Sequence, residues 1–289
     1  MNYWEVSLMD CQIKITDNKA VWKIQAALAL IFLLNPFLGV LSTLFFVFVS
    51  KEKSMAFYLV IILTLFMWCL QSTRSFHLGE PSDWAGNYYY NFHNAAITDT
   101  LTYLFFTTKE YAWQAFNLIG YYLFDGDFLS YANFIVALTY MFTFAAIYKF
   151  WNYIQADPRF LVASLCLFAF VTEVNGICNN LLRQQFAMSM MLYAIIERCT
   201  NGRILYPLLV ISFFTHTMTG FFIPFLFIRL GKKASFRFYI YIVLGFGLLY
   251  ILFTNLSIFS SSSFYAFQRL ATASNAYALK DIIQPSAVY

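Results

Sequence analysis

Long apolar stretches recur along this chain, and they constrain its fold more than any other feature. A helix that crosses a bilayer needs roughly 20 mostly apolar residues, because backbone polar groups in hydrocarbon must pair within their own segment. The stretches that meet or approach this requirement are residues 27–49, 55–70, 131–150, 160–174, 185–196 and 239–259. We therefore predict an all-α polytopic membrane protein in which residues 1–289 form a single integral-membrane domain.

The composition supports the same class of protein. Hydrophobic residues make up 61% of the chain and charged residues 11%, against about 25% charged residues in soluble domains. The net charge of +4 is small, and the basic residues fall in short turns, so we expect the lipid bilayer and not nucleic acid as the partner. The cysteines are scattered without a C-x-x-C pair, which indicates neither a disulfide framework nor a zinc site. We expect no cofactor and no metal centre.

Lysine and arginine positions predict the orientation, because cytoplasmic turns retain these residues. They collect at four turns, namely Lys51 with Lys53, Lys149 with Arg159, Arg198 with Arg203, and Arg229 with Lys232, Lys233 and Arg237. All four turns lie on the cytoplasmic side only if residues 204–228 form a hairpin of two short helices with His216 near its tip. It also places residues 71–129 outside, as an extracytoplasmic segment whose apolar part, 111–124, forms an interfacial or re-entrant helix. The expected bundle has roughly eight transmembrane or half-membrane helices.

The first apolar stretch has two interpretations. Three lysines precede it, namely Lys14, Lys19 and Lys23. They favour a cytoplasmic N-terminus, whereas the later turns favour a crossing from outside. Either residues 27–49 cross once, or Asn35-Pro36 breaks them into a shallow hairpin. We prefer the single crossing.

Residues 179–191, NNLLRQQFAMSMM, place amides and an arginine where a helix enters the predicted bilayer. Arg183 keeps its charge at any accessible pH and offers a planar fork of donors that matches phosphate oxygens. At the start of a helix, its charge adds to free backbone N–H groups and suits a pyrophosphate. Asn179, Asn180 and Gln184 stand beside it. The alternative is a snorkelling arginine that only fixes the helix end, but the surrounding amides favour the anion site.

Other parts of the chain supply further polar candidates. His216 can hold a phosphate or a sugar hydroxyl or act as a base, or it is a hydrogen-bonded packing residue. Asp83 stands five residues before Tyr88 and Tyr89. A carboxylate binds sugar hydroxyls or acts as a base, and tyrosine rings stack on sugars; the alternatives are a solvated loop residue and an interfacial belt. Glu173 is either a base or a structural partner of the arginine.

In their order along the chain, these residues resemble the EpsG family of polysaccharide polymerases, akin to the Wzy polymerases of O-antigen, capsule and exopolysaccharide synthesis. The resemblance covers about residues 35–230 and rests on Arg74…Asp83…Tyr88-Tyr89, KEYAWQAFNLIGYYLF from Lys109 and Glu110 on, NNLLRQQFAMSMMLYAI, and FFTHTMTGFFIPFLF. A proline that is common after the Lys-Glu pair is absent, and threonines replace a serine context after His216. The final spans of many members are also missing, so we expect the polar tail, residues 260–289, to be a truncated end.

The resemblance implies transfer of an oligosaccharide from an undecaprenyl-pyrophosphate carrier to a growing chain, at the outer face of the bacterial inner membrane. It implies that Arg183 stabilises the pyrophosphate, with Arg74 and His216 assisting. Asp83 or Glu173 is the implied base or sugar ligand. The other implied substrate ligands are Tyr88, Tyr89, Lys109, Glu110, Asn179, Asn180 and Gln184.

Two other functions stay open. A transporter or flippase of lipid-linked sugar needs the same anion site, but it typically carries polar groups at the midplane of the membrane. A non-catalytic subunit of a polysaccharide synthesis complex is favoured by the short end of the chain. Other polysaccharide export proteins are expected partners in each case.

Overall fold

The computed structural model describes residues 18–50, 53–73, 83–105, 110–171 and 181–227. These residues all lie in one compact unit of the chain, residues 1–229. Every regular element in this described part is a helix, which confirms the all-α prediction. The elements are α1 (Asn18–Leu34), α2 (Pro36–Ser50), α3 (Lys53–Ser72), the π-helical turn η1 (Trp84–Tyr88), α4 (Tyr89–Ile97), α5 (Thr100–Phe105), α6 (Tyr111–Leu123), α7 (Phe128–Ile154), α8 (Pro158–Phe170), α10 (Leu182–Asn201), α11 (Tyr206–Thr215) and the 3-10 segment η2 (Thr217–Phe227).

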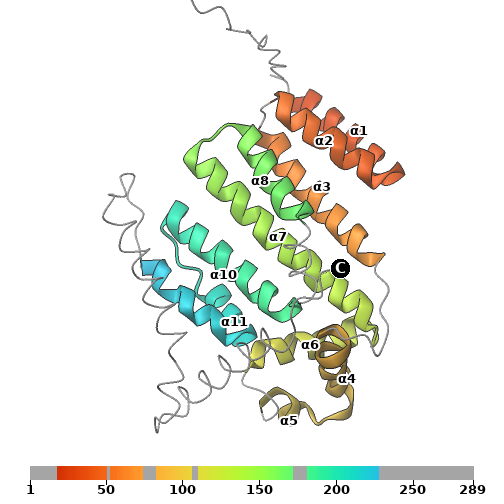
Figure 1. The fold of residues 1–289 in the computed structure, drawn as a ribbon, viewed down its shortest axis with the longest axis vertical. Helices are drawn as coiled ribbons and strands as arrows, with labels where there is room; N and C mark the ends of the chain where they lie inside the picture. The colour runs from red at the N-terminus through yellow and green to blue at the C-terminus, as the bar shows by residue number, and fades with distance from the viewer. Residues whose placement is uncertain (1–17, 51–52, 74–82, 106–109, 172–180, 228–289) are drawn as a thin grey trace, which may run out of the picture. The chain divides into compact units, whose positions relative to one another are not determined.

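The long helix α7 packs against α3 on one side and α10 on the other (Figure 1). Its buried residues Ile135 and Tyr140 share one hydrophobic core with Leu63 of α3 and Phe186 of α10. Large apolar side chains also cover the outside of the unit, as at Leu33, which is 78% exposed. An apolar exterior around an apolar core is what a bilayer environment requires, because lipid tails are as apolar as the side chains they contact.

Two helical segments of the described residues, Ser54–Ser72 and Phe128–Ile154, are long and apolar enough to cross a membrane. They confirm the helices expected at residues 55–70 and 131–150. The stretch expected at 160–174 is the shorter helix α8, and the stretch at 185–196 lies within α10. The remaining apolar stretch, 239–259, and the polar tail, 260–289, lie outside the described residues.

Local sequence sets where several of these helices begin and end. Asp127 precedes α7, and its carboxylate accepts a hydrogen bond from the hydroxyl of Ser130 at 2.6 Å. Asp157 precedes α8 and accepts from the backbone N–H of Arg159 at 2.8 Å, with a proline at the first helical position. Both are N-caps that satisfy donors without a partner inside the helix. α10 ends before Gly202, whose φ of 72° favours glycine.

The first apolar stretch is two helices, so the single crossing that we preferred for residues 27–49 is wrong. Pro36 cannot donate a backbone hydrogen bond, and the side chain of Asn35 accepts one at 3.1 Å from the first turn of α2. α1 and α2 pack side by side as a hairpin (Figure 1). A Cβ atom on Gly39 would lie 2.4 Å from the Cα atom of Phe32, so the close approach of the two helices requires glycine.

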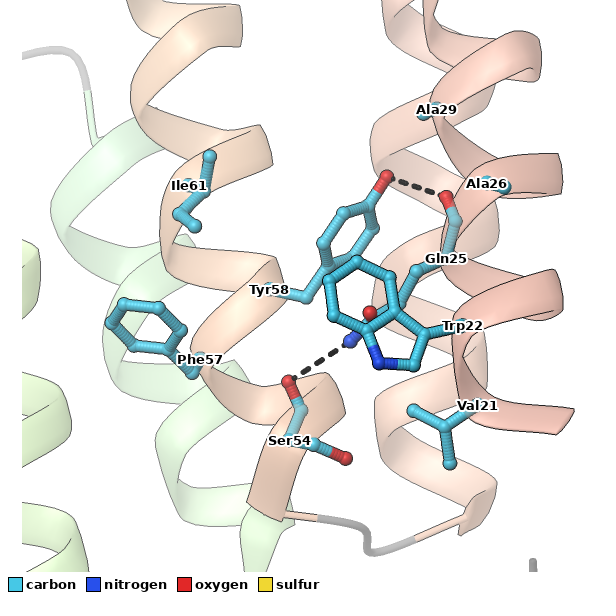
Figure 2. Close-up of a pocket in the computed structure, with 9 residues that line it drawn as sticks. All are labelled: Val21, Trp22, Gln25, Ala26, Ala29, Ser54, Phe57, Tyr58 and Ile61. Carbon is cyan, nitrogen blue, oxygen red and sulfur yellow. Dashed lines mark hydrogen bonds between the residues drawn. The ribbon is translucent and has the colours of Figure 1, made fainter. Parts of the chain in front are cut away.

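Because of this hairpin, the first half of α1 lies beside the start of α3. The hydroxyl of Tyr58 donates to the backbone carbonyl of Gln25 at 2.9 Å, and the Gln25 side chain donates to the carbonyl of Ser54 at 3.5 Å (Figure 2). The positions of Lys23 and Lys53 are therefore at the same end of the helices. If these helices cross a bilayer, both positions fall on one side of it, and the conflict between the N-terminal lysines and the later turns is removed.

Residues 204–228 contain the expected pair of short helices, α11 and η2, with His216 between them. The hydroxyl of Ser212 donates to the carbonyl of Ala187 at 2.8 Å, so α11 runs back along α10 toward its first turn. At the other end of α10, Nε of Arg198 donates to the carbonyl of Leu226 at 3.1 Å. The chain thus goes out along α11 and returns along η2, which confirms the hairpin with His216 at its tip.

Short helices gather near the N-terminal end of α7 (Figure 1). The helix expected at 111–124 is α6, which packs against α4, α5 and α11. The ring of Phe92 in α4 stacks on that of Tyr131 in α7, with centroids 4.8 Å apart. These contacts hold the start of α6 next to the tip of the α11–η2 hairpin. The extracytoplasmic location of residues 71–129 stays a prediction.

Candidate functional site

Glu110, Arg183 and His216 come together from three separate parts of the chain. Glu110 precedes α6, Arg183 lies in the first turn of α10, and His216 follows α11. The Glu110 carboxylate forms an ion pair with the Arg183 guanidinium, and its Oε1 atom lies 2.8 Å from Nδ1 of His216. Three residues that the sequence singled out are therefore in direct contact. We call them the Glu110 cluster.

The Glu110 cluster is partly shielded from solvent. The exposed fraction is 23% for the Arg183 side chain and 14% each for Glu110 and His216. Charges at such sites interact more strongly than in water, because the effective dielectric constant is about 20 instead of about 80. One carboxylate therefore contacts both the Arg183 guanidinium and the His216 ring.

The contact between Glu110 and His216 assigns a role to each ring nitrogen. An ionised carboxylate only accepts hydrogen bonds, so Nδ1 of His216 carries the proton that points at Glu110. In a neutral ring Nε2 is then the acceptor. An imidazole that a carboxylate holds in this tautomer is able to take a proton at Nε2 from a hydroxyl group.

Two buried N–H donors at this end of α6 and α10 lack a hydrogen-bond partner within the described part of the chain. They are Nε of Arg183 and Nε1 of Trp113. Trp113 lies in the first turn of α6, three residues after Glu110, and its ring meets the edge of Tyr88 at 5.8 Å between centroids. Leaving a buried donor unpaired costs about 1–3 kcal/mol, and native proteins contain few such groups. These two N–H groups are therefore candidate donors to the acceptor oxygens of a ligand.

Tyr88 connects the Glu110 cluster to η1. Its side chain is buried, and the charge of Arg183 at the start of α10 acts on its hydroxyl group. Burial raises the pKa of Tyr88 to about 12; the positive charge of Arg183 opposes this rise, and the negative charges of Asp83 and Glu110 add to it. The phenol is thus a neutral hydroxyl at physiological pH, within the electrostatic reach of Asp83.

A polar network beside the cluster was not predicted from the sequence. Gln114 and Asn117 of α6 are each 1% exposed. The hydroxyl of Tyr131 donates to Oδ1 of Asn117 at 2.8 Å, and Nδ2 of Asn117 donates to Gln114 at 3.5 Å. The available signal was the spacing of two amides three residues apart on a short apolar helix, which puts both on one face. This network ties α6, and with it Glu110, to α7.

The other candidates are less closely tied to this cluster. Gln184 follows Arg183 in α10 and is half-buried. The ring of Tyr89 belongs to an aromatic cluster, where it lies 4.1 Å from that of His93 and 5.7 Å from that of Phe128. Five candidates lie outside the described residues: Arg74, Lys109, Glu173, Asn179 and Asn180. From the sequence, Glu173 was a candidate structural partner of Arg183, whereas the acidic side chain that the structure shows in contact with Arg183 is Glu110.

No group of three or more His, Cys, Asp or Glu side chains suited to a metal ion occurs among the residues that the structure describes. The Glu110 cluster instead combines a fixed cation, a carboxylate and an oriented imidazole. The chemistry of such a set suits binding of an anion and transfer of a proton, two operations that transfer from a phosphorylated donor requires.

Comparison with known proteins bears directly on this chemistry. The sequence profile of the EpsG family matches residues 57–282, a range that contains all three members of the Glu110 cluster. No curated protein and no solved structure matches the chain significantly.

Proposed function

Because this chain belongs to the EpsG family, a family of Wzy-like polysaccharide polymerases, we propose that it joins undecaprenyl-pyrophosphate-linked oligosaccharide units at the outer face of the bacterial inner membrane. The protein acts as a glycosyltransferase in the synthesis of an exopolysaccharide, capsule or O-antigen. The observation that carries the proposal is the contact of Glu110 with both Arg183 and His216. The arginine suits a leaving pyrophosphate, and the histidine suits an attacking hydroxyl.

Arg183 stabilises the pyrophosphate as it leaves. Its guanidinium has several donors in one plane, and a pyrophosphate brings more negative charge than one carboxylate, so the substrate is able to displace Glu110 from part of the fork. The Nε–H of Arg183 has no partner among the described residues, so one donor is available before any displacement. Stabilisation of developing charge by such prearranged donors is usually the largest catalytic contribution.

His216 removes the proton from the acceptor hydroxyl. The hydroxyl oxygen attacks the anomeric carbon of the donor, the bond from that carbon to the pyrophosphate oxygen breaks, and its electron pair leaves with the pyrophosphate. The hydroxyl proton moves to Nε2 of His216, while Nδ1 keeps its hydrogen bond to Glu110. A positioned general base contributes about 100-fold to 10,000-fold to the rate.

Asp83 and Tyr88 serve as sugar ligands in this proposal. Asp83 is exposed, and Tyr88 is buried against the start of α10, so a sugar bound between them has one solvated side. Arg74, Lys109, Glu173, Asn179 and Asn180 keep the substrate-binding or proton-transfer roles that the sequence resemblance implies, as do Gln184 and Tyr89.

The test is glycan synthesis by the purified protein in lipid vesicles that contain the lipid-linked repeat unit. We expect wild-type protein to form products longer than one repeat and Arg183→Ala to lose this activity. Arg159→Ala is the matched control, because Arg159 is an exposed arginine in the first turn of α8. The same vesicles report movement of the lipid across the bilayer. Movement without lengthening would make the protein a transporter, and neither activity would indicate a non-catalytic subunit; each result would overturn the proposal.

A further inference from the structure

A second polar site lies at the end of α7 and α10 that is remote from the Glu110 cluster. A pocket of about 420 Å³ opens there among α3, α7 and α10, lined by Lys149 and Asn152 of α7 together with Thr200 and Asn201 of α10. Thr200 lies 17 residues along α10 from Arg183, which corresponds to about 25 Å at about 1.5 Å per residue. A ligand in this pocket is therefore separate from one at the Glu110 cluster.

Lys149, which lines the pocket, and two charged residues beside the pocket, Glu197 and Arg203, together leave a positive surplus. Lys149 forms an ion pair with Glu197, whose carboxylate also accepts a hydrogen bond from Nδ2 of Asn201 at 2.8 Å. The positive charge of Arg203 is close enough to act on the same carboxylate. Two cations thus face one anion, and the surplus favours a ligand with a negatively charged group such as a phosphate.

The same pocket also favours a hydrogen-bond donor that carries positive charge. Oδ1 of Asn152 is buried and accepts no hydrogen bond within the described part of the chain. The carbonyl ends of α7 and α10, which border the pocket, carry partial negative charge. The rings of Tyr148 and Tyr153 line it, and aromatic faces attract cations; the ring of Tyr193 already lies under Lys149, with Nζ 5.5 Å from its centroid. Because Asn152 lines the pocket, a rotation of its amide would present the oxygen to an ammonium group there.

An apolar groove of about 580 Å³ between α1 and α3 adjoins the pocket, because Phe57 lines both. Trp22 and Ile61 are among the side chains along this groove, and the contact between Gln25 and Ser54 marks its polar end (Figure 2). Phe57 thus stands between a pocket that contains charged and amide side chains and a groove that is mostly apolar. This is the pattern of a lipid headgroup followed by a hydrocarbon chain.

We propose that the pocket and the groove together bind one phosphatidylethanolamine molecule. The headgroup phosphate contacts Lys149, the ammonium contacts Asn152 and the carbonyl ends of the two helices, and one acyl chain follows the groove past Phe57. Phosphatidylglycerol offers a phosphate and hydroxyl donors but no positive charge. Phosphatidylcholine offers a positive charge but no hydrogen-bond donor. The ethanolamine headgroup has both, and both match groups in the pocket.

The experiment is native mass spectrometry of the purified full chain in detergent, with the three phospholipids supplied at equal concentration and with identical acyl chains. We expect phosphatidylethanolamine to be retained about tenfold over phosphatidylcholine, the ratio that corresponds to one charged hydrogen bond. Equal retention of the three lipids, or a preference for phosphatidylglycerol, would overturn the assignment.

Two variants place the preference in this pocket. Asn152→Leu removes the acceptor and should abolish the preference, whereas Asn133→Leu should keep it. Asn133 is the matched control because its Oδ1 atom is also buried without a partner among the described residues, toward the other end of α7. The double variant Lys149→Met/Glu197→Gln removes both charges, so that neither is left unpaired, and should lower the retention of all three phospholipids, because each carries the phosphate. A preference that persists in Asn152→Leu, or unchanged retention in the double variant, would contradict the site.

Discussion

Oε1 of Glu110 lies 2.8 Å from Nδ1 of His216, although 106 residues separate them in the chain. Glu110 immediately precedes α6 and His216 immediately follows α11, so their contact depends on the packing of these two helices. The ring of Tyr111, next to Glu110, lies 5.8 Å from that of Phe214. An aromatic contact beside the pair therefore holds the carboxylate against the imidazole.

His216→Ala should lower polymer yield by about 100-fold or more, because the variant loses the proposed base. His93→Ala is the matched control. His93 lies in α4 with Nδ1 3.0 Å from the carbonyl of Tyr89, and its loss should leave the yield close to that of wild type. The measurement is glycan chain length and yield in cells at matched protein level. Normal polymer from His216→Ala would return this histidine to a packing role.

Cysteines introduced at Lys23 and Ser54 should lie on the same side of the membrane, because the α1–α2 hairpin brings Gln25 to Ser54. In a cysteine-free background, a membrane-impermeant maleimide should label both only after permeabilisation, if basic turns are cytoplasmic. A cysteine at Tyr122, which is 71% exposed in α6, should label from outside. Labelling of positions 23 and 54 from opposite sides would restore the single crossing.

The apolar pattern was sufficient to predict most of the helices, because a membrane helix is specified by local composition and length. Asn35-Pro36 was visible as a break. The choice between one crossing and a hairpin, however, depends on the close approach of Gly39 to Phe32, a tertiary contact that no local pattern specifies. The hairpin at His216 could be predicted because basic residues on both sides of 204–228 required the chain to return.

The candidate site was predictable residue by residue but not as a set. Arg183, His216 and Glu110 are conspicuous because ionisable groups are rare in so apolar a chain. Their connection through Glu110 requires α6, α10 and α11 to be neighbours, which is a property of the packed helices. For the same reason, the ion pair of Lys149 with Glu197 was not expected, since Lys149 served only to mark a turn.

Tyr88→Phe should lower the rate about tenfold through loss of one hydroxyl contact, without changing the shape of the pH–rate profile between about pH 7 and about pH 10. Burial raises the pKa of Tyr88 to about 12, so the phenol is protonated throughout this range. Its raised pKa also implies a contribution to folding stability that is present below about pH 10. This contribution is lost as the pH rises toward the pKa of Tyr88 in the folded protein. An alkaline change in the wild-type profile that Tyr88→Phe lacks would contradict this assignment.

Asp127→Ala should destabilise the protein by about 1 kcal/mol through loss of the N-cap of α7. The hydroxyl of Ser130 and the first backbone N–H groups of α7 lower the pKa of Asp127. Its contribution is therefore present above the ordinary aspartate pKa of about 3.9 and is lost as the pH falls through the lower, folded value. Thermal unfolding in detergent should show the difference at neutral pH and not in acid, and Asp127→Asn should lose less. An equal difference at all pH values would exclude the carboxylate as its source.

Arg183→Lys separates a pyrophosphate clamp from a helix anchor. Lysine keeps the positive charge and the ion pair with Glu110, but it lacks the planar fork, so an anchor role would leave insertion and activity unchanged. For a clamp, loss of one charge-assisted hydrogen bond should cost about 1.5–3 kcal/mol, or about tenfold to a hundredfold in rate, and alanine should do worse. Arg159→Lys is the control for the substitution itself. Arg159 lies on α8, away from the Glu110 cluster, with its Cζ atom 4.9 Å from the ring centroid of Phe48. Glycan chain length in cells at matched protein level is the measurement, and full-length polymer from Arg183→Ala would exclude the clamp.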